Sequence, residues 1–170
     1  MFYTRRGDSG KSGLFGTKKR ISKGDQVYEA LGSVDELNSF LGICRVEDSA
    51  HVSSLIEVQQ CLFIIQAELA GTKKTITKKE LSRLEKHIDE ASSSIVSPHA
   101  FVIPGATKVS AQYDFARAVC RRAERALIQA ETLCPLSSAT KAYINRLSSF
   151  LYVLARKAAQ ESGKEDTPHY

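Results

Sequence analysis

Apolar residues recur every three or four positions through most of the chain after residue 33, which is the spacing of one face of an α-helix. The clearest runs are "LIEVQQCLFIIQAEL" at 55–69 and "INRLSSFLYVLA" at 144–155. The pattern predicts helices over residues 33–46, 51–70, 77–91, 108–131 and 138–160. Because the connections between them are short, an all-α, up-and-down five-helix bundle is expected.

Local signals place the ends of these helices. Ser33 with Glu36, and Thr77 with Glu80, have the spacing of a capping box at a helix start. Gly71 ends the second run, and "SPHAFVIPGATK" at 97–108 is a break bounded by prolines. No stretch alternates apolar and polar residues clearly enough to predict a sheet.

Residues 1–32 differ from the rest, since they hold six of the ten glycines and show no sustained helical or strand period. We expect one domain in three parts: an irregular, glycine-rich N-terminal arm at 1–32, the helical bundle at 33–162, and a polar tail at 163–170. An arm that is disordered in isolation is the simplest interpretation of the first part.

Composition narrows the function classes only slightly. Apolar residues make up 42% and charged residues 25% of the chain, and the net charge of +5 suits a polyphosphate ligand without requiring one. Neither a secretory signal nor an apolar run of transmembrane length is present, and the four cysteines lack metal-ligand spacing. These features favour a reducing compartment, either the cytoplasm or an organellar matrix, with no membrane and no direct metal-ligand residues.

The arm opens with "RRGDSGKSG" at 5–13, which ends like the phosphate loop of P-loop proteins. That loop requires a glycine where Arg5 stands, and it requires a buried strand before it, so a P-loop is excluded. The composition still suits phosphate, because glycines let backbone N–H groups turn toward an anion and Asp8 has an oxygen ligand suited to Mg²⁺. The residues concerned are Arg5, Arg6, Gly7, Asp8, Gly10, Lys11 and Ser12.

A second phosphate signal lies in "ARAVCRRAERALIQA" at 116–130. Arg117, Arg121 and Arg125 are four residues apart and form one ridge along the predicted helix, whereas Arg122 points elsewhere. Forked guanidinium groups suit phosphate oxygens, and Glu124 neutralises little of the charge. A solvated basic face paired with acids on neighbouring helices remains an equal alternative on these grounds.

Together the segments resemble the PduO-type ATP:cob(I)alamin adenosyltransferases. The arm is similar to that family's T-x-T-G-D-x-G-x-T…LFGG…R-x-x-K segment, and "EALGSVDELNSFLG" is similar to its E-A-x-G-x-x-D-E-L-N-S-x-L-G. "FVIPG", "ARAVCRRAER" and "INRLSSFLYVLAR" match the remaining blocks, so five ordered motifs span about residues 3–157.

The resemblance implies a trimeric five-helix bundle with active sites between subunits. The implied reaction transfers the 5′-deoxyadenosyl group of ATP to the cobalt(I) of cobalamin or a related corrinoid, and triphosphate leaves. ATP, Mg²⁺ and a corrinoid are the implied ligands, with a corrinoid reductase or an adenosylcobalamin-dependent enzyme as a further partner and no nucleic acid. No nucleophilic side chain is needed, which agrees with the lack of a Ser/His/Asp or Cys/His constellation.

The resemblance also assigns roles residue by residue. Asp35 and Arg117 match a salt-bridged pair near the corrinoid, and Phe101 matches an aromatic residue that displaces the lower axial ligand of cobalt. Arg121 belongs to both the catalytic and the nucleotide-binding sets. The implied nucleotide-binding residues are Thr4, Arg5, Arg6, Gly7, Asp8, Gly10, Ser12, Lys23, Arg121, Arg122, Glu124, Arg125 and Asn145.

The sequence departs from the family pattern at several positions. Arg6 stands where a threonine is usual, Lys11 where a small or hydroxyl residue is common, and Ser149 where an aspartate is frequent. The first two changes raise the positive charge available to phosphate and alter the expected geometry of the arm. A non-catalytic helical module that binds a polyanion or a corrinoid is the alternative function.

Overall fold

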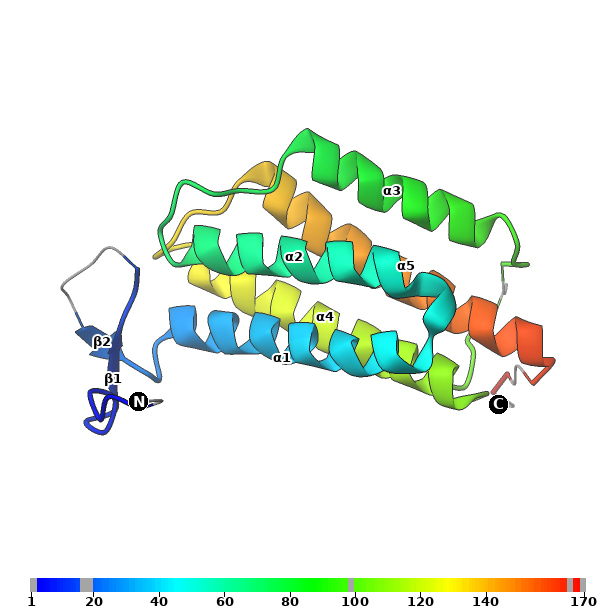
Figure 1. Ribbon diagram of the computed structural model, residues 1–170, viewed down its shortest axis with the longest axis horizontal. Coiled ribbons are helices and arrows are strands. Elements are labelled where there is room, and N and C mark those ends of the chain that lie inside the picture. Colours follow the sequence, from blue (N-terminus) through cyan, green and yellow to red (C-terminus); the bar gives the residue numbers. More distant parts are fainter. Residues whose placement is uncertain (1–2, 16–19, 98–99, 165–166, 169–170) are drawn as a thin grey trace.

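Within residues 3–15, 20–97, 100–164 and 167–168, which the computed structural model describes, the chain forms five α-helices that alternate in direction (Figure 1). This confirms the predicted all-α bundle. The two chain ends lie at opposite ends of the bundle. The elements are β1 (Lys11–Gly13), β2 (Arg20–Ser22), α1 (Gln26–Glu47), the 3₁₀ turn η1 (Ser49–His51), α2 (Val52–Leu69), α3 (Lys78–Ser92), α4 (Lys108–Ala130) and α5 (Ser138–Ser162).

Helix α1 begins seven residues before the predicted start. Asp25 caps it, because its carboxylate accepts a hydrogen bond from the Val27 N–H at 3.0 Å. Ser33 is therefore a buried residue within the helix, and the predicted capping box at Ser33 and Glu36 is wrong. The second predicted capping box is confirmed, since the Thr77 N–H donates to the Glu80 carboxylate at 2.7 Å at the start of α3.

The arm contains regular structure that the sequence pattern did not indicate. Strands β1 and β2 pair in antiparallel fashion, with Ser12 opposite Ile21. Each strand has three residues, which is too short for alternation to be recognised. The prediction that the chain has no sheet is wrong for this hairpin.

The core fills the space between the helices with the predicted apolar stripes. α4 packs along both α5 and α1, α3 packs mainly on α5, and α2 packs mainly on α1. The stripe residues at the centre are fully buried, among them Leu37, Leu62, Ala123 and Leu151. Because α4 and α5 lie side by side over most of their length, side chains from both can line one surface.

Asp48 joins the C-terminal end of α1 to α4 by a hydrogen bond from Tyr113. Its carboxylate accepts hydrogen bonds from Tyr113 Oη at 2.7 Å, His51 Nδ1 at 2.8 Å and the Ala50 N–H at 3.0 Å. Burial of the carboxyl favours its neutral form, but the bonds from Tyr113, His51 and Ala50 and the charge of His51 outweigh burial and lower the pKa of Asp48.

We expect Asp48→Asn to reduce the free energy of unfolding at pH 7 by roughly 1–3 kcal/mol, because charged acceptors contribute more than neutral ones. The stability from ionised Asp48 is fully present above the ordinary aspartate pKa and is lost as the pH falls through the lowered one. The difference between wild type and variant in urea unfolding should therefore shrink in acid. A constant difference from pH 7 to pH 2 would contradict this linkage.

Candidate active site

An open pocket of about 750 Å³ lies where the segment before α4 meets the paired helices α4 and α5. Three of the predicted site residues, Phe101, Arg117 and Arg121, line it together. The remaining lining residues are Ala100, Val102, Pro104, Asp114, Ser148, Ser149, Tyr152, Val153 and Arg156. We call this hollow the Phe101 pocket. Phe101 is 78% exposed, so its ring stands at the pocket without being packed into the core.

A buried ion pair forms part of the pocket wall. Arg156 is 1% exposed, and its Nη2 lies 2.7 Å and 2.6 Å from the two carboxylate oxygens of Asp114. The Tyr152 ring is flanked by two guanidinium groups, that of Arg156 at 5.3 Å and that of Arg117 at 5.5 Å from its centroid. Arg117 is therefore held by an aromatic contact, and through Tyr152 it is connected to the Asp114–Arg156 pair.

The guanidinium ridge is continuous, because Arg117, Arg121 and Arg125 all fall within the single helix α4. Arg121 and Arg125 are exposed and Arg117 is half-buried. Next to this ridge, Asn145 Nδ2 of α5 donates to Glu124 Oε1 at 2.9 Å, so two predicted nucleotide residues from different helices do meet.

Arg122 takes a different direction, as expected from its place on the helix. Its guanidinium pairs with Glu36 on α1. That carboxylate raises the pKa of Arg122 through a hydrogen bond and its charge. Arg122 is thus engaged on the α1 side of α4, away from the residues that line the Phe101 pocket.

The arm is closed by hydrogen bonds between its two halves. The Lys23 N–H donates to the Gly10 carbonyl at 2.9 Å, and the Arg20 guanidinium donates to the carbonyls of Lys11, at 2.5 Å, and Arg6. Gly10 has a φ of 71°, where side chains are disfavoured. Arg20 is not among the predicted site residues, although its side chain joins the turn at Arg6 to strand β1.

The Lys23 side chain occupies the space that a side chain at position 7 would need. A Cβ atom on Gly7 would stand 2.9 Å from Lys23 Nζ, so the ammonium group lies directly over the backbone of Gly7. The other predicted arm residues form tight turns beneath it: the Asp8 N–H donates to the Arg5 carbonyl at 3.3 Å, and the Arg6 N–H to Thr4 Oγ1 at 3.4 Å. Ser12 lies in β1.

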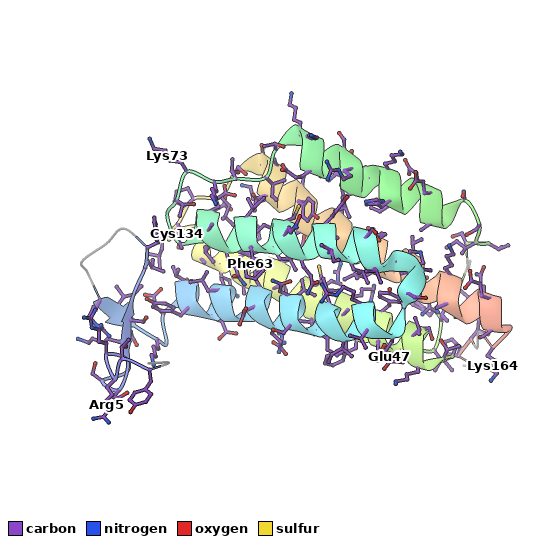
Figure 2. The ribbon with its side chains drawn as sticks, in the orientation of Figure 1. Arg5, Glu47, Phe63, Lys73, Cys134 and Lys164 are labelled. Carbon is purple, nitrogen blue, oxygen red and sulfur yellow. The ribbon has the colours of Figure 1, made fainter. Side chains whose placement is uncertain are left out.

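The arm and the ridge lie at the same end of the bundle, and no hydrogen bond or ion pair joins their described residues. α4 ends at the same end of the bundle where the arm leaves α1 (Figure 1), and Figure 2 shows Arg5 at the far tip of the arm. Among the described residues, the hydrogen bonds of the arm stay within the arm or reach the start of α1. Closure of the arm around a triphosphate therefore stays a prediction.

Asp35 lies apart from the Phe101 pocket. It lines a second hollow of about 360 Å³ between α1 and α2, together with Arg45, Ile56 and Phe63. Within the described part of one chain it forms no ion pair with Arg117, whose guanidinium contacts Tyr152. The predicted pairing of Asp35 and Arg117 is thus not made inside one chain.

The chemistry available at the pocket is that of binding and charge stabilisation. Over the described residues, no three His, Cys, Asp or Glu side chains gather as a metal site. Burial raises the pKa of Cys44 to about 12 and also raises those of Cys61, Cys120 and Cys134, so these thiols are poor nucleophiles at neutral pH.

The described helices also include none with the length and apolarity needed to cross a bilayer.

Comparison with known proteins shows the family to which the chain belongs. Residues 2–158 match the family described as cobalamin adenosyltransferase. The chain belongs to this family. The matched range includes the arm, the Phe101 segment and the whole guanidinium ridge, so the resemblance predicted from five motifs is confirmed.

Individual relatives agree with the assignment. The corrinoid adenosyltransferase PduO of Salmonella typhimurium is 40% identical over 163 residues, which cover 91% of this chain and 48% of that protein. The chain thus spans about half the length of that relative. The cobalamin adenosyltransferase of Cupriavidus metallidurans is 35% identical over 167 residues, which cover 96% of this chain and 90% of that protein.

The fold also agrees with a solved structure. A variant of a PduO-type ATP:corrinoid adenosyltransferase from Lactobacillus reuteri, complexed with cobalamin and ATP, superposes with a TM-score of 0.89 at 28% identity. The match covers 100% of this chain and 96% of that one. The five-helix bundle is therefore the fold of that adenosyltransferase.

Proposed function

We propose that this chain is a corrinoid adenosyltransferase, which transfers the 5′-deoxyadenosyl group of ATP to the cobalt(I) of cobalamin or a related corrinoid. One observation carries the proposal: the guanidinium ridge begins in the same open pocket that Phe101 lines. A polyanion and a large planar ligand can thus meet along α4. The family and its ATP- and cobalamin-bound member support the same activity.

In the proposed reaction the cobalt(I) electron pair forms a bond to C5′ of the ribose while the C5′–O bond breaks and triphosphate leaves. The protein contributes orientation and stabilisation of the charge that develops on the leaving group. Arg121 lines the pocket and is exposed, so its fork is available to that group. Arg117 stands beside it, held against Tyr152.

The nucleotide is proposed to lie along the ridge toward the arm. Arg125 continues the ridge, and the hydrogen-bonded side chains of Glu124 and Asn145 lie beside it. The arm would fold over the phosphates with Lys23 lying against the turn at Gly7. The arm residues proposed to contact the phosphates are Thr4, Arg5, Arg6, Gly7, Asp8, Gly10 and Ser12. Arg122 is proposed to support the site indirectly, since its guanidinium is paired with Glu36 on α1.

Mg²⁺ is proposed to arrive bound to the triphosphate. Mg²⁺ usually takes most of its ligands from phosphates and water and only one or two from protein carboxylates. Asp8 offers an exposed carboxylate in the arm, which fits that limited role. The ion would neutralise phosphate charge.

The active unit is proposed to be a homotrimer with sites between subunits. Asp35 is exposed and shares its hollow with Ile56 and Phe63, and Phe63 is an exposed aromatic residue on α2 (Figure 2). An interface over this hollow would cover apolar surface and bring Asp35 to Arg117 of a second copy. Light scattering should report three chains per particle.

A cytoplasmic location also stays a prediction.

The activity is tested with the full chain, ATP, Mg²⁺ and reduced cobalamin, following the cobalamin absorbance change with time. We expect catalytic conversion to adenosylcobalamin with release of triphosphate. Tight binding of cobalamin without turnover would instead indicate a carrier. Binding of a random oligonucleotide, but not of ATP, in calorimetry would indicate a polyanion-binding module.

Phe101→Ala should reduce turnover about tenfold when the reaction starts from cob(II)alamin with a reductant, and clearly less when cob(I)alamin is supplied. An apolar wedge at the lower face removes an axial ligand, and four-coordinate cobalt(II) is easier to reduce. Ile103→Ala is the matched control, because Ile103 is an exposed neighbour in the same segment that does not line the pocket. Equal losses from both starting states would show that Phe101 only packs.

A further inference from the structure

Helix α5 extends beyond the Phe101 pocket, and its next turn holds the segment that carries Phe101. Tyr152, Arg156 and Gln160 are four residues apart, so they follow one face of α5. The first two line the pocket. Gln160 Oε1 accepts a hydrogen bond from the Val96 N–H at 3.0 Å, and Gln160 Nε2 donates to the Val96 carbonyl at 2.7 Å. The side-chain amide thus matches both polar groups of one backbone residue.

The other end of the segment is fixed at the start of α4. The Thr107 N–H donates to Ser110 Oγ at 2.8 Å, and the Ser110 N–H donates to Thr107 Oγ1 at 3.0 Å. Ser110 is fully buried, so this cap is part of the bundle. Phe101 therefore lies between two anchored points of the segment. Val96 is hydrogen-bonded to Gln160 of α5, and Thr107 caps the start of α4. Residues 98–99, which link Val96 to Phe101 along the chain, lie outside the described residues.

Most described side chains of the segment between these anchors are exposed, although Val102 and Ala106 are half-buried. Phe101 is 78% exposed, Val96 76% and Ile103 47%. Exposed apolar side chains bury little surface and contribute little to position. The hydrogen bonds at Val96 and Thr107 therefore contribute much of the stabilisation of the described part of this segment.

We propose that Gln160 is a positioning residue: by holding the backbone of Val96 it sets where Phe101 stands at the pocket. Gln160 lies beyond residue 158, where the family match ends, so the family match does not extend to it. The effect on turnover rests on the proposed corrinoid reaction, whereas the anchor itself does not.

The anchor is tested by amide hydrogen exchange in the full, unliganded chain. Gln160→Leu replaces the amide with a shorter apolar side chain, and we expect the Val96 amide to exchange about tenfold faster, with amides inside α4 and α5 unchanged. Gln129→Leu on the exposed side of α4 is the matched control. Unchanged exchange at Val96 would overturn the anchor.

Gln160→Glu is a second variant that keeps the length of the side chain. Its carboxylate still accepts from the Val96 N–H but sets a second oxygen against the Val96 carbonyl. Once protonated, the carboxyl group can donate to that carbonyl again. Exchange at Val96 should therefore approach the wild-type rate as the pH falls through the ordinary glutamate range. An excess over wild type that is independent of pH would overturn the amide-matching geometry.

The positioning role is tested by turnover from two starting states. Gln160→Leu should be about fivefold slower than wild type from cob(II)alamin, within about twofold from supplied cob(I)alamin, and unchanged in the KM for ATP. Equal effects from both states, or no effect, would overturn the role. If the wild-type chain forms no adenosylcobalamin, the proposed function fails together with this half of the inference, while exchange still decides whether Gln160 holds Val96.

Discussion

Arg121→Ala is expected to lower kcat by about tenfold or more and to raise the KM for ATP, because a charged donor aimed at a leaving group contributes about 3 kcal/mol to the transition state. The structure favours this residue over its neighbours. Arg121 is exposed and lines the Phe101 pocket, whereas Arg117 lies against Tyr152 and Arg122 is paired with Glu36. Steady-state kinetics with varied ATP measures both parameters.

Two further variants separate the causes of that loss. Arg121→Lys keeps the charge but not the fork, so it should recover part of the activity if charge matters and little if two-point contact matters. Arg83→Ala, on α3, is the control for loss of an exposed arginine, because Arg83 pairs with Glu57 of α2 and does not line the Phe101 pocket. Wild-type kinetics in Arg121→Ala would remove this residue from the site.

Deletion of residues 1–13 is expected to reduce turnover to the background while the helical content stays unchanged. The deletion removes β1 and the turns over which Lys23 lies, so the phosphates lose the predicted binding residues from Thr4 to Ser12. The bundle should survive, because the α1 cap at Asp25 and the first core residue, Val27, both follow the deleted part. Turnover and far-UV circular dichroism are measured on the same preparation.

Ser9→Ala provides the control for the arm, since Ser9 is exposed and has no predicted role. It should retain wild-type turnover. A large loss of helical signal after the deletion would mean that the arm supports the fold. Full turnover of the deleted chain would exclude the arm as the nucleotide-binding element.

The helices could be predicted because their buried faces are regular, and the one misplaced start shows what disturbs that regularity. α1 buries Ser33 and Asn38 along with its apolar residues. These polar residues interrupt the apolar stripe. In the first two turns, the aliphatic residues before Gly32 are Val27, Ala30 and Leu31. The Asp25 cap was therefore missed, while the strongly amphipathic α4 was placed within one residue.

The parts that could not be predicted depend on partners far away in the sequence. Periodicity places Arg156 within an apolar face, but it does not reveal that Asp114, 42 residues earlier, neutralises it. The Gln160 and Val96 contact spans 64 residues and involves backbone atoms. Such pairs follow from how elements that are distant in the sequence pack against each other, which local patterns do not encode. The nucleotide residues were found through motif resemblance, and their roles stay predictions.

The pitch of α4 has a consequence for the spacing of the two ligands. Four residues of an α-helix rise about 6 Å, so Arg117 and Arg125 are separated by about 12 Å along the axis. Under the proposed function, the phosphates lie at Arg121 and Arg125, while Arg117 stands one turn further into the Phe101 pocket. The rise of a rigid helix then sets the distance between the phosphates and the corrinoid.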